Sequence, residues 1–300
     1  DPIRNMTFHR AESHALFWLT LLSPLAAWMT ARLSCGADSF RHWWLAIWLI
    51  LITHTLLDAM TVYGTQLLLP FSDYPFGVAS IFIIDPLYTV PLLIGLMCAL
   101  RWPGERGGNA NRLGLFISTL YLCWTVLIQQ YVASIAADSL AAADIRAERT
   151  LVTPTPFNTL IWRVLVMTED GYAEGFYSLL DGDRPIRFDH FPRGAQLHAE
   201  LTQQWHTARM AWFSHGFFAM AECEGRIRIT DLRMGQEPDY AFSFVVAERD
   251  AGRVRSIVPV AKPMQRNIGA GLRWLQQRVV DANVPPLHRQ HQPACADNGG

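Results

Sequence analysis

Two side chains that could act together stand four residues apart in an apolar stretch of the sequence. His54 and Asp58 lie within residues 43–100, which contain no Lys or Arg. Residues four apart on a helix leave the same face about one turn apart, as two ligands of one ion would. An ionised carboxylate is costly at membrane depth, and no basic residue lies nearby in sequence to neutralise it. We therefore expect a bound metal cation, with a protonated Asp58 or a purely structural hydrogen bond as the alternative.

Two further imidazoles, His9 and His14, stand just before the first apolar run, with Arg10 between them. Imidazole is a common ligand of transition metals, so the pair suggests a second part of the same metal site. Five residues apart on a regular helix, the two rings would point about 140° apart, so one must lie in a loop or first turn. The alternative is a set of polar residues that open a helix at the interface. Arg10 could orient a phosphate or carboxylate, or extend to the membrane surface.

Polar groups recur at the ends of the neighbouring apolar segments. Asp85 precedes Pro86, so it either caps a helix that begins there or faces a substrate. Four hydrogen-bonding side chains follow Asp58 and either line a cavity or meet the interface: Thr61, Tyr63, Thr65 and Gln66. The sequence contains no GxSxG, HExxH or phosphate-binding glycine loop, so these common hydrolase motifs are excluded.

Four apolar runs would position these groups: residues 15–33, 43–69, 78–100 and 113–137. Each is close to or above the ~20 residues that a helix needs to cross a bilayer, which predicts about four transmembrane helices. Residues 101–112 are rich in Gly, Asn and Arg, and we expect a polar loop there. A polytopic α-helical membrane domain that carries the metal site is therefore predicted over residues 1–140.

The second half of the chain carries charges every few residues and predicts a small α+β soluble domain over residues 157–263, after a linker at 141–156. Alternating apolar residues and turn signals predict strands, and a longer helical pattern predicts a helix. The strands are expected at 160–167, 172–180, 186–188, 226–232 and 240–247, and the helix at 195–222. A C-terminal helix at 265–280 and a disordered tail are expected within 264–300.

Composition limits the function classes and indicates an orientation. Only 17% of the residues are charged, against ~25% in a typical soluble domain, and the net charge is −1, so no nucleic-acid partner is expected. Arginines occur at 32–42 and 101–112 and are absent from 70–77. By the positive-inside rule, the two arginine-bearing connections face the cytoplasm and the soluble domain faces the periplasm, although Arg4 and Arg10 oppose this.

Three segments in combination, HRAESHAL, HTLLDAMTVYGTQLLLPFSD and FIIDPLYTVPLL, resemble the YdjM-like family of inner-membrane, metal-dependent hydrolases. The resemblance covers about residues 1–165. The family elements H-R-x-x-[ST]-H and H-x-x-x-D fall on His9, Arg10, Ser13, His14, His54 and Asp58. Family members also carry an earlier P-D-x-D element that this chain lacks, so the resemblance implies an N-terminally truncated member with an incomplete metal shell.

The resemblance implies a bacterial inner-membrane hydrolase without naming its substrate. We expect a divalent metal, zinc by its ligand types, held by His9, His14, His54 and Asp58. Arg10 and Asp85 are expected to serve the reaction, and the position at the bilayer suggests an ester or phosphoester of an amphiphilic or lipid-linked substrate. The main alternative is a non-catalytic membrane adaptor whose soluble domain binds a protein partner. A transporter that uses Asp58 and Asp85 is disfavoured, because the chain has no internal repeat.

Overall fold

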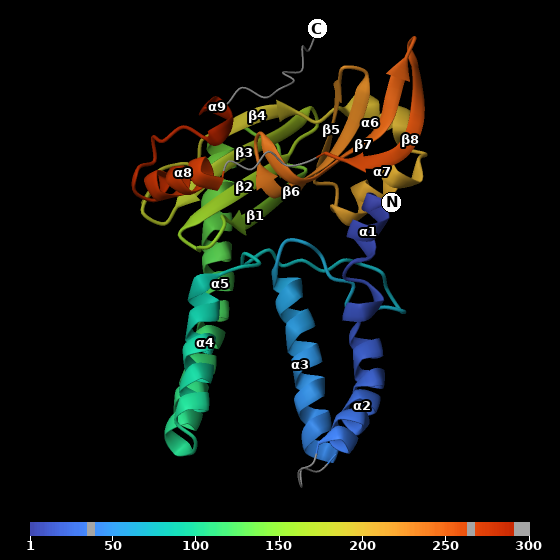
Figure 1. Ribbon diagram of the computed structural model, residues 1–300. Coiled ribbons are helices and arrows are strands. Elements are labelled where there is room, and N and C mark those ends of the chain that lie inside the picture. Colours follow the sequence, from blue (N-terminus) through green and yellow to red (C-terminus); the bar gives the residue numbers. More distant parts are fainter. Residues whose placement is uncertain (35–39, 263–267, 291–300) are drawn as a thin grey trace.

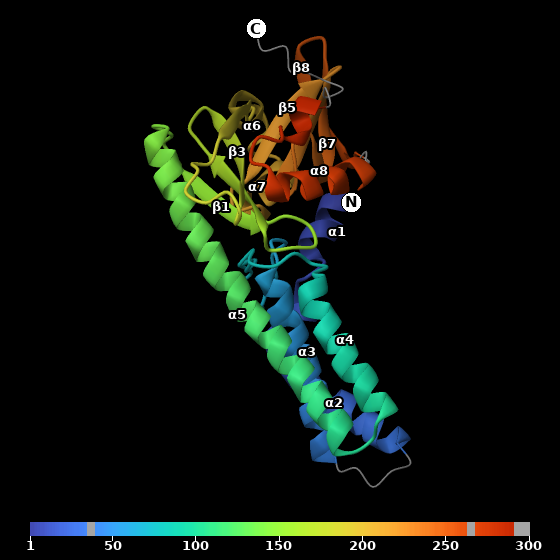
Figure 2. The ribbon, with the colours of Figure 1, turned by 90° about the vertical axis from the view of Figure 1, so that its left-hand side faces the viewer.

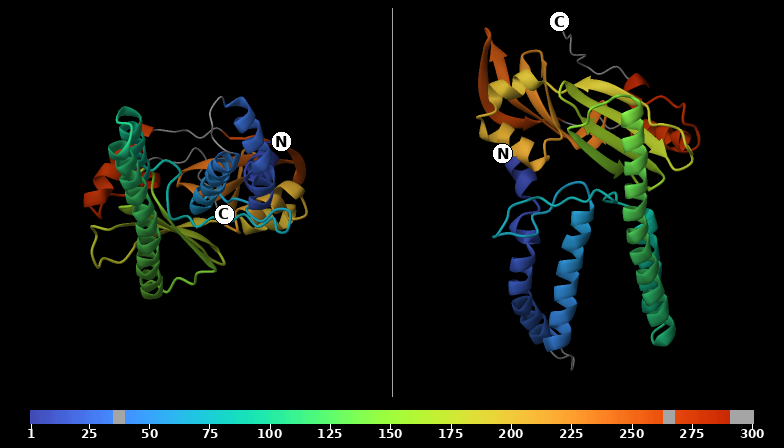
Figure 3. Two further views of the ribbon diagram at one scale, coloured as in Figure 1. Left: turned by 90° about the horizontal axis from the view of Figure 1, so that it is seen from below. Right: turned by 180° about the vertical axis from the view of Figure 1, so that it is seen from behind.

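Two helical hairpins extend from a β domain at one end of the molecule (Figure 1). The structure, a computed structural model, describes residues 1–34, 40–262 and 268–290. The long helices are α2 (Leu16–Leu33), α3 (Phe40–Met60), α4 (Pro86–Arg101) and α5 (Glu105–Ala142). Helix α2 packs against α3, and α4 packs against α5, and the view from below shows the two pairs apart (Figure 3). A polytopic helical part followed by a separate β-containing part is thus confirmed.

Three of the helices, α2, α3 and α5, are long and apolar enough to cross a membrane. Many of their large apolar side chains are exposed, as expected for helices whose solvent is lipid. Helix α4 is also apolar but has 16 residues, fewer than the ~20 of an ordinary span. The structure therefore supports three of the four predicted crossings, and α4 alone is too short for the fourth.

The second predicted run, 43–69, is helical only as far as Met60. Residues 61–85 instead form an irregular connection across the upper ends of the hairpins (Figure 1). Gly64 takes a positive φ of 106°, a conformation that interrupts helical geometry and that residues with a Cβ rarely adopt. Apolar composition alone therefore overestimates the length of this helix.

The third predicted run, 78–100, is helical only from Pro86 onward. The Asp85 side chain accepts hydrogen bonds from backbone N–H groups in the first turn of α4, which fixes the start of the helix at this point.

The polar loop predicted at 101–112 is largely helical, because α5 begins at Glu105. One of its glycines, Gly107, serves helix packing. A Cβ on Gly107 would lie 2.1 Å from the carbonyl oxygen of Trp102, so glycine is what allows α5 to approach the end of α4. The glycine-rich composition of this segment thus predicted a loop where the structure has the start of a helix.

The β domain consists of two four-stranded antiparallel sheets, each with its strands in sequential order. The first sheet contains β1 (Arg149–Pro154), β2 (Ile161–Met167), β3 (Gly171–Ser178) and β4 (Phe188–Pro192). The second contains β5 (Phe218–Cys223), β6 (Arg226–Gln236), β7 (Asp239–Asp250) and β8 (Arg253–Ala261). The shorter helices are α1 (Pro2–Phe8), α6 (Ala195–Leu201), α7 (Trp205–Phe213), α8 (Ile268–Val280) and α9 (Leu287–Gln290).

Three of these strands correct the prediction. Strand β1 lies within the expected linker 141–156, β5 lies at the end of the expected helix 195–222, and β8 follows the last expected strand. The helical part of 195–222 is divided into α6 and α7. Strands β1 and β5 pair with the following strand along their whole length, so the neighbouring strand decides their conformation more than their own sequence does.

The two sheets are joined through a core that includes a buried ion pair. Tyr172 of β3 and Tyr240 of β7 belong to one cluster of buried side chains. Arg163 on β2 pairs with Glu174 on β3 and donates a hydrogen bond of 2.7 Å to the carbonyl oxygen of Leu232 on β6. Because buried charges are stable only when fully paired, this network fixes the two sheets relative to each other.

Helix α1 packs into the β domain, although the sequence placed residues 1–140 in the membrane domain. Ile3 and Met6 are buried in a cluster that includes Met210 and Phe213 of α7. Figure 1 shows the N-terminus beside α7. The short segment after α1 therefore runs directly from the β-domain core to the first membrane helix.

Candidate metal site

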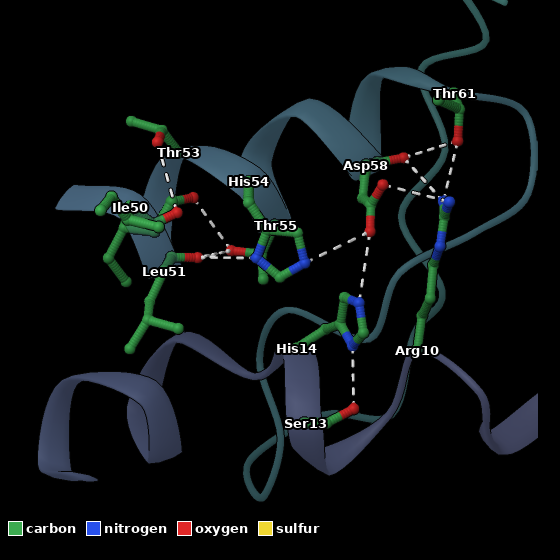
Figure 4. A network of polar contacts seen from close by, with 11 residues as sticks. Arg10, Ser13, His14, Ile50, Leu51, Thr53, His54, Thr55, Asp58 and Thr61 are labelled. Atoms are coloured by element: carbon green, nitrogen blue, oxygen red, sulfur yellow. Dashed lines mark hydrogen bonds and ion pairs between the residues drawn. The ribbon is translucent and has the colours of Figure 1, made fainter. Parts of the chain in front are cut away.

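The structure brings Asp58 together with a segment that is far away in the sequence. Asp58 lies in the last turn of α3, and Arg10 follows α1. Nη2 of Arg10 lies 3.1 Å from Oδ1 of Asp58, and Nη1 donates to the Asp58 backbone oxygen and to Oγ1 of Thr61 (Figure 4). Asp58 therefore has a basic partner, which contradicts the expectation drawn from its local sequence. The Arg10 guanidinium is directed at Asp58 and positions this carboxylate, and its predicted role toward a substrate phosphate stays a prediction.

Two imidazoles face the other oxygen of Asp58 (Figure 4). Nε2 of His14 lies 3.3 Å from Oδ2 of Asp58, and Nε2 of His54 lies 3.8 Å from the same oxygen. One ligand atom from each of the three residues lies within 4.8 Å of the others. Ligands about 2.1 Å from a tetrahedral zinc ion stand roughly 3.4 Å apart, so small side-chain shifts would let these donors share one ion. His14, His54 and Asp58 thus form a candidate site with two imidazoles and one carboxylate.

The second nitrogen of each imidazole also has a neighbour. Nδ1 of His14 lies 2.9 Å from Oγ of Ser13, and Nδ1 of His54 lies 3.3 Å from the carbonyl oxygen of Leu51. Because a carbonyl oxygen can only accept, a neutral His54 carries its proton on Nδ1 and turns an unprotonated Nε2 toward Asp58. Two electron-rich atoms that face each other favour a cation between them. The contacts of the two Nδ1 atoms are also typical of metal-binding histidines, whose second ring nitrogen is bonded to an oxygen.

The site is open on one side. The His54 side chain is 48% exposed, whereas those of His14 and Asp58 are 15% and 21% exposed. Burial lowers the pKa of His14 below its usual value, and this effect outweighs the opposing effect of Asp58. The neutral imidazole that results is the form that binds metals. Three protein ligands with an open side are typical of catalytic zinc sites.

His9 lies beside the group but outside it. The centre of its ring is 6.5 Å from that of His14 and 6.2 Å from that of Tyr63, which it meets edge-on. A short 3-10 helix (Glu12–His14) precedes α2, so the chain turns between the two histidines as their spacing requires. Of the four predicted ligands, the structure thus brings three together and leaves His9 as their neighbour.

Asp85 has a structural role at the start of α4, and its predicted catalytic role stays a prediction. Its Oδ1 accepts hydrogen bonds from the N–H groups of Leu87 and Tyr88, and its Oδ2 accepts one from the Tyr121 hydroxyl at 2.8 Å. It therefore caps α4 and ties it to α5, as the alternative interpretation of the Asp85-Pro86 pair predicted.

Three of the four polar side chains after Asp58, those of Thr61, Tyr63 and Gln66, hold the N-terminal segment in place. The Tyr63 hydroxyl donates to the carbonyl oxygen of Met6 at 2.6 Å, and the Gln66 side chain donates to that of Thr7 at 3.1 Å. The Arg10 guanidinium lies 4.8 Å from the centre of the Tyr63 ring. Burial raises the pKa of Tyr63 to about 12, so its hydroxyl remains a donor.

Comparison with known proteins adds one finding. The comparisons with curated proteins and with solved structures give no match. Residues 1–132 match the model of the family described as YdjM inner membrane protein. The matched range includes Arg10, His14, His54 and Asp58 and ends within α5, before the sheets begin. The first 132 of the 300 residues, which carry these four side chains, are therefore similar to the YdjM inner membrane protein family.

Proposed function

We propose that this membrane protein is a metal-dependent hydrolase whose metal is held by His14, His54 and Asp58. The observation that carries the proposal is the meeting of both Nε2 atoms at Oδ2 of Asp58, from two segments of the chain. Two imidazoles and a carboxylate are a donor set suited to zinc. When bound, a divalent ion supplies Lewis acidity and an activated water, which is the chemistry that ester and phosphoester hydrolysis needs.

The surrounding residues hold the ligands in place. Ser13 and the carbonyl oxygen of Leu51 orient the two rings, and Arg10 occupies Oδ1 of Asp58 so that Oδ2 faces the imidazoles. Such partners usually tune metal affinity, because they fix the direction and basicity of the ligand atoms.

The depth of the site supports an amphiphilic or lipid-linked substrate. His54 lies six residues before the end of α3, which corresponds to about 9 Å along the helix axis. A substrate at the boundary between the lipid headgroups and the hydrocarbon could therefore reach the half-exposed His54 side chain. Substrates with an ester or phosphoester next to an apolar chain fit this position.

The arginine distribution supports a periplasmic β domain. Arg32 and Arg41 lie at the end of the first hairpin away from the β domain, and Arg101, Arg106 and Arg112 lie at that end of the second (Figure 1). The positive-inside rule assigns that end to the cytoplasm. The metal site would then lie at the outer leaflet of the inner membrane.

The metal content of the purified full-length protein tests the proposal. Wild type should retain about one zinc per chain, and His14→Ala, His54→Ala and Asp58→Ala should each lose most of it. His42→Ala, at the other end of α3, is the matched control and should behave as wild type. Hydrolysis of fluorogenic amphiphilic esters and phosphoesters should fall in parallel and should be sensitive to EDTA. Equal metal content in all five proteins would refute the site.

A purely structural role for the same group is the second candidate, and the Arg10–Asp58 pair favours it. Because Arg10 already supplies a positive charge, Asp58 does not require a metal for charge balance. Under this alternative, the three alanine variants unfold at lower temperature, zinc has no effect on any of them, and no EDTA-sensitive hydrolysis is observed.

A further inference from the structure

We propose that the loop between β1 and β2, residues 155–160, is immersed in the lipid bilayer beside α4 and α5. This inference does not depend on the proposed hydrolase function. It rests on helix α5, which slants from the far end of the hairpins past the first sheet and so serves as a depth scale (Figure 2).

The upper edge of the hydrocarbon can be placed along α5. Arg101 and Glu105 mark the lower end of the second hairpin. A hydrocarbon core of ~30 Å corresponds to about 20 helical residues. Counting about 20 residues from Glu105 places the upper edge of the hydrocarbon at about residue 125 of α5. Tilt of the helix, or a lower boundary at Arg106 or Arg112, would move this edge further along α5.

The β1–β2 loop contacts α5 below that edge. The Tyr121 and Thr159 hydroxyls lie 3.1 Å apart, and Nε1 of Trp124 donates to the Thr159 hydroxyl at 3.4 Å. The Phe157 ring meets the Phe82 ring edge-on, with 5.4 Å between their centres. The loop therefore lies level with the last turns of the apolar span, beside the residues that lead into α4.

The surface of the loop is apolar. Residues 155–160 and 78–84 contain no ionisable side chain. The large side chains that they expose are apolar: Phe157 is 43% exposed, Leu160 42%, Val78 48%, Ile83 60% and Ile84 61%. An uncharged, apolar exposed surface at this depth matches the hydrocarbon and headgroup boundary of a bilayer.

One side chain, Asn158, satisfies several of the polar groups of the loop. Oδ1 of Asn158 accepts from the N–H groups of Leu160 and Ile161, both at 2.9 Å. Its Nδ2 donates to the carbonyl oxygen of Pro156 and to Oγ1 of Thr155. Backbone groups in hydrocarbon have no water to bond, so irregular segments persist there only when the protein supplies partners. Residues 78–85 lie at the same depth as the loop. Together with them, the 16 residues of α4 are enough to cross the hydrocarbon.

Photo-crosslinking to lipid tests this placement. The variant Phe157→p-benzoylphenylalanine keeps an aromatic ring at the tip of the loop and leaves the rest of the chain unchanged. It is reconstituted in vesicles of phosphatidylethanolamine and phosphatidylglycerol with radiolabelled acyl chains. The same probe at Leu93, exposed on α4, is the lipid-facing reference. The same probe at Arg253, at the β7–β8 turn that points away from the helices in Figure 1, is the water-facing control.

Lipid labelling at position 157 should approach that at position 93 and exceed that at position 253 several-fold. Labelling at 157 no higher than at 253 would overturn the proposal. If the Phe157 variant does not accumulate in the membrane, the same probe at Leu160 decides between the two results. Metal content plays no part in this readout, so the outcome is separate from that of the zinc measurement.

Discussion

Asp58 and Asp85 are both carboxylates at the β-domain end of a helical hairpin, yet their surroundings differ. Asp85 accepts hydrogen bonds from N–H and O–H donors of α4 and α5, the hairpin that it begins. Asp58 faces a guanidinium and two imidazoles, and Arg10 lies 48 residues away in the sequence. An acid in apolar sequence is therefore not by itself a sign of chemistry. The convergence of several titratable groups from different segments is the feature that distinguishes the two sites.

Replacing Arg10 with Met should have the largest effect, because it leaves Asp58 without its positive partner. Removing one member of a buried ion pair costs about 3–5 kcal/mol, and the lower end applies here because Asp58 is 21% exposed. Zinc should restore part of this stability if the site binds metal. Thermal unfolding in detergent, with EDTA and with added zinc, measures both effects. A loss of stability that zinc leaves unchanged would show that Asp58, like Asp85, only stabilises the fold and does not bind metal.

Replacing Ser13 with Ala should weaken zinc binding while leaving all three ligands in place. His14 loses the oxygen that orients its ring, and loss of such a partner typically raises the metal dissociation constant about 10–100-fold. Competition with a chromogenic chelator measures the constant. Ser134→Ala, at an exposed position on α5, is the control and should not change it. Equal constants in the two variants would show that Ser13 does not orient a ligand.

Replacing Asp85 with Ala should have the smallest effect and should not involve metal. The variant loses the cap of α4 and the bond to Tyr121, so we expect a loss of about 1–2 kcal/mol in the free energy of unfolding. Zinc content and zinc affinity should equal those of wild type. Reduced zinc content in this variant would contradict the contrast between the two acids and restore a catalytic role for Asp85.

Part of the site could be predicted from local spacing. His54 and Asp58 share a helix, and residues four apart on a helix share a face whatever the rest of the fold does. The Arg10–Asp58 pair could not be predicted in this way, since it depends on α1 packing into the β domain. The expectation of an acid without a basic partner was wrong for the same reason.

The fold shows a similar division between strong and weak local signals. The inner strands of the two sheets, β2, β3, β6 and β7, lie within or close to the predicted segments, whereas three of the four edge strands were missed. Strand β2 is buried along its whole length and is apolar except for Arg163, whereas β8 is largely exposed. Edge strands carry polar residues that limit aggregation, and these residues weaken the pattern by which a strand is recognised. Membrane helices were found by hydropathy, but their ends depend on caps and glycine contacts.

The burial of α1 in the β domain also sets an order of assembly. Ile3 and Met6 find their partners on α7, β5, β6 and β7, none of which exists until more than two hundred residues have been synthesised. Arg10 and His14 are therefore made before these elements, and they reach their final positions only after the later half of the sequence has folded around α1. Completion of the candidate metal site is thereby a late event in biogenesis.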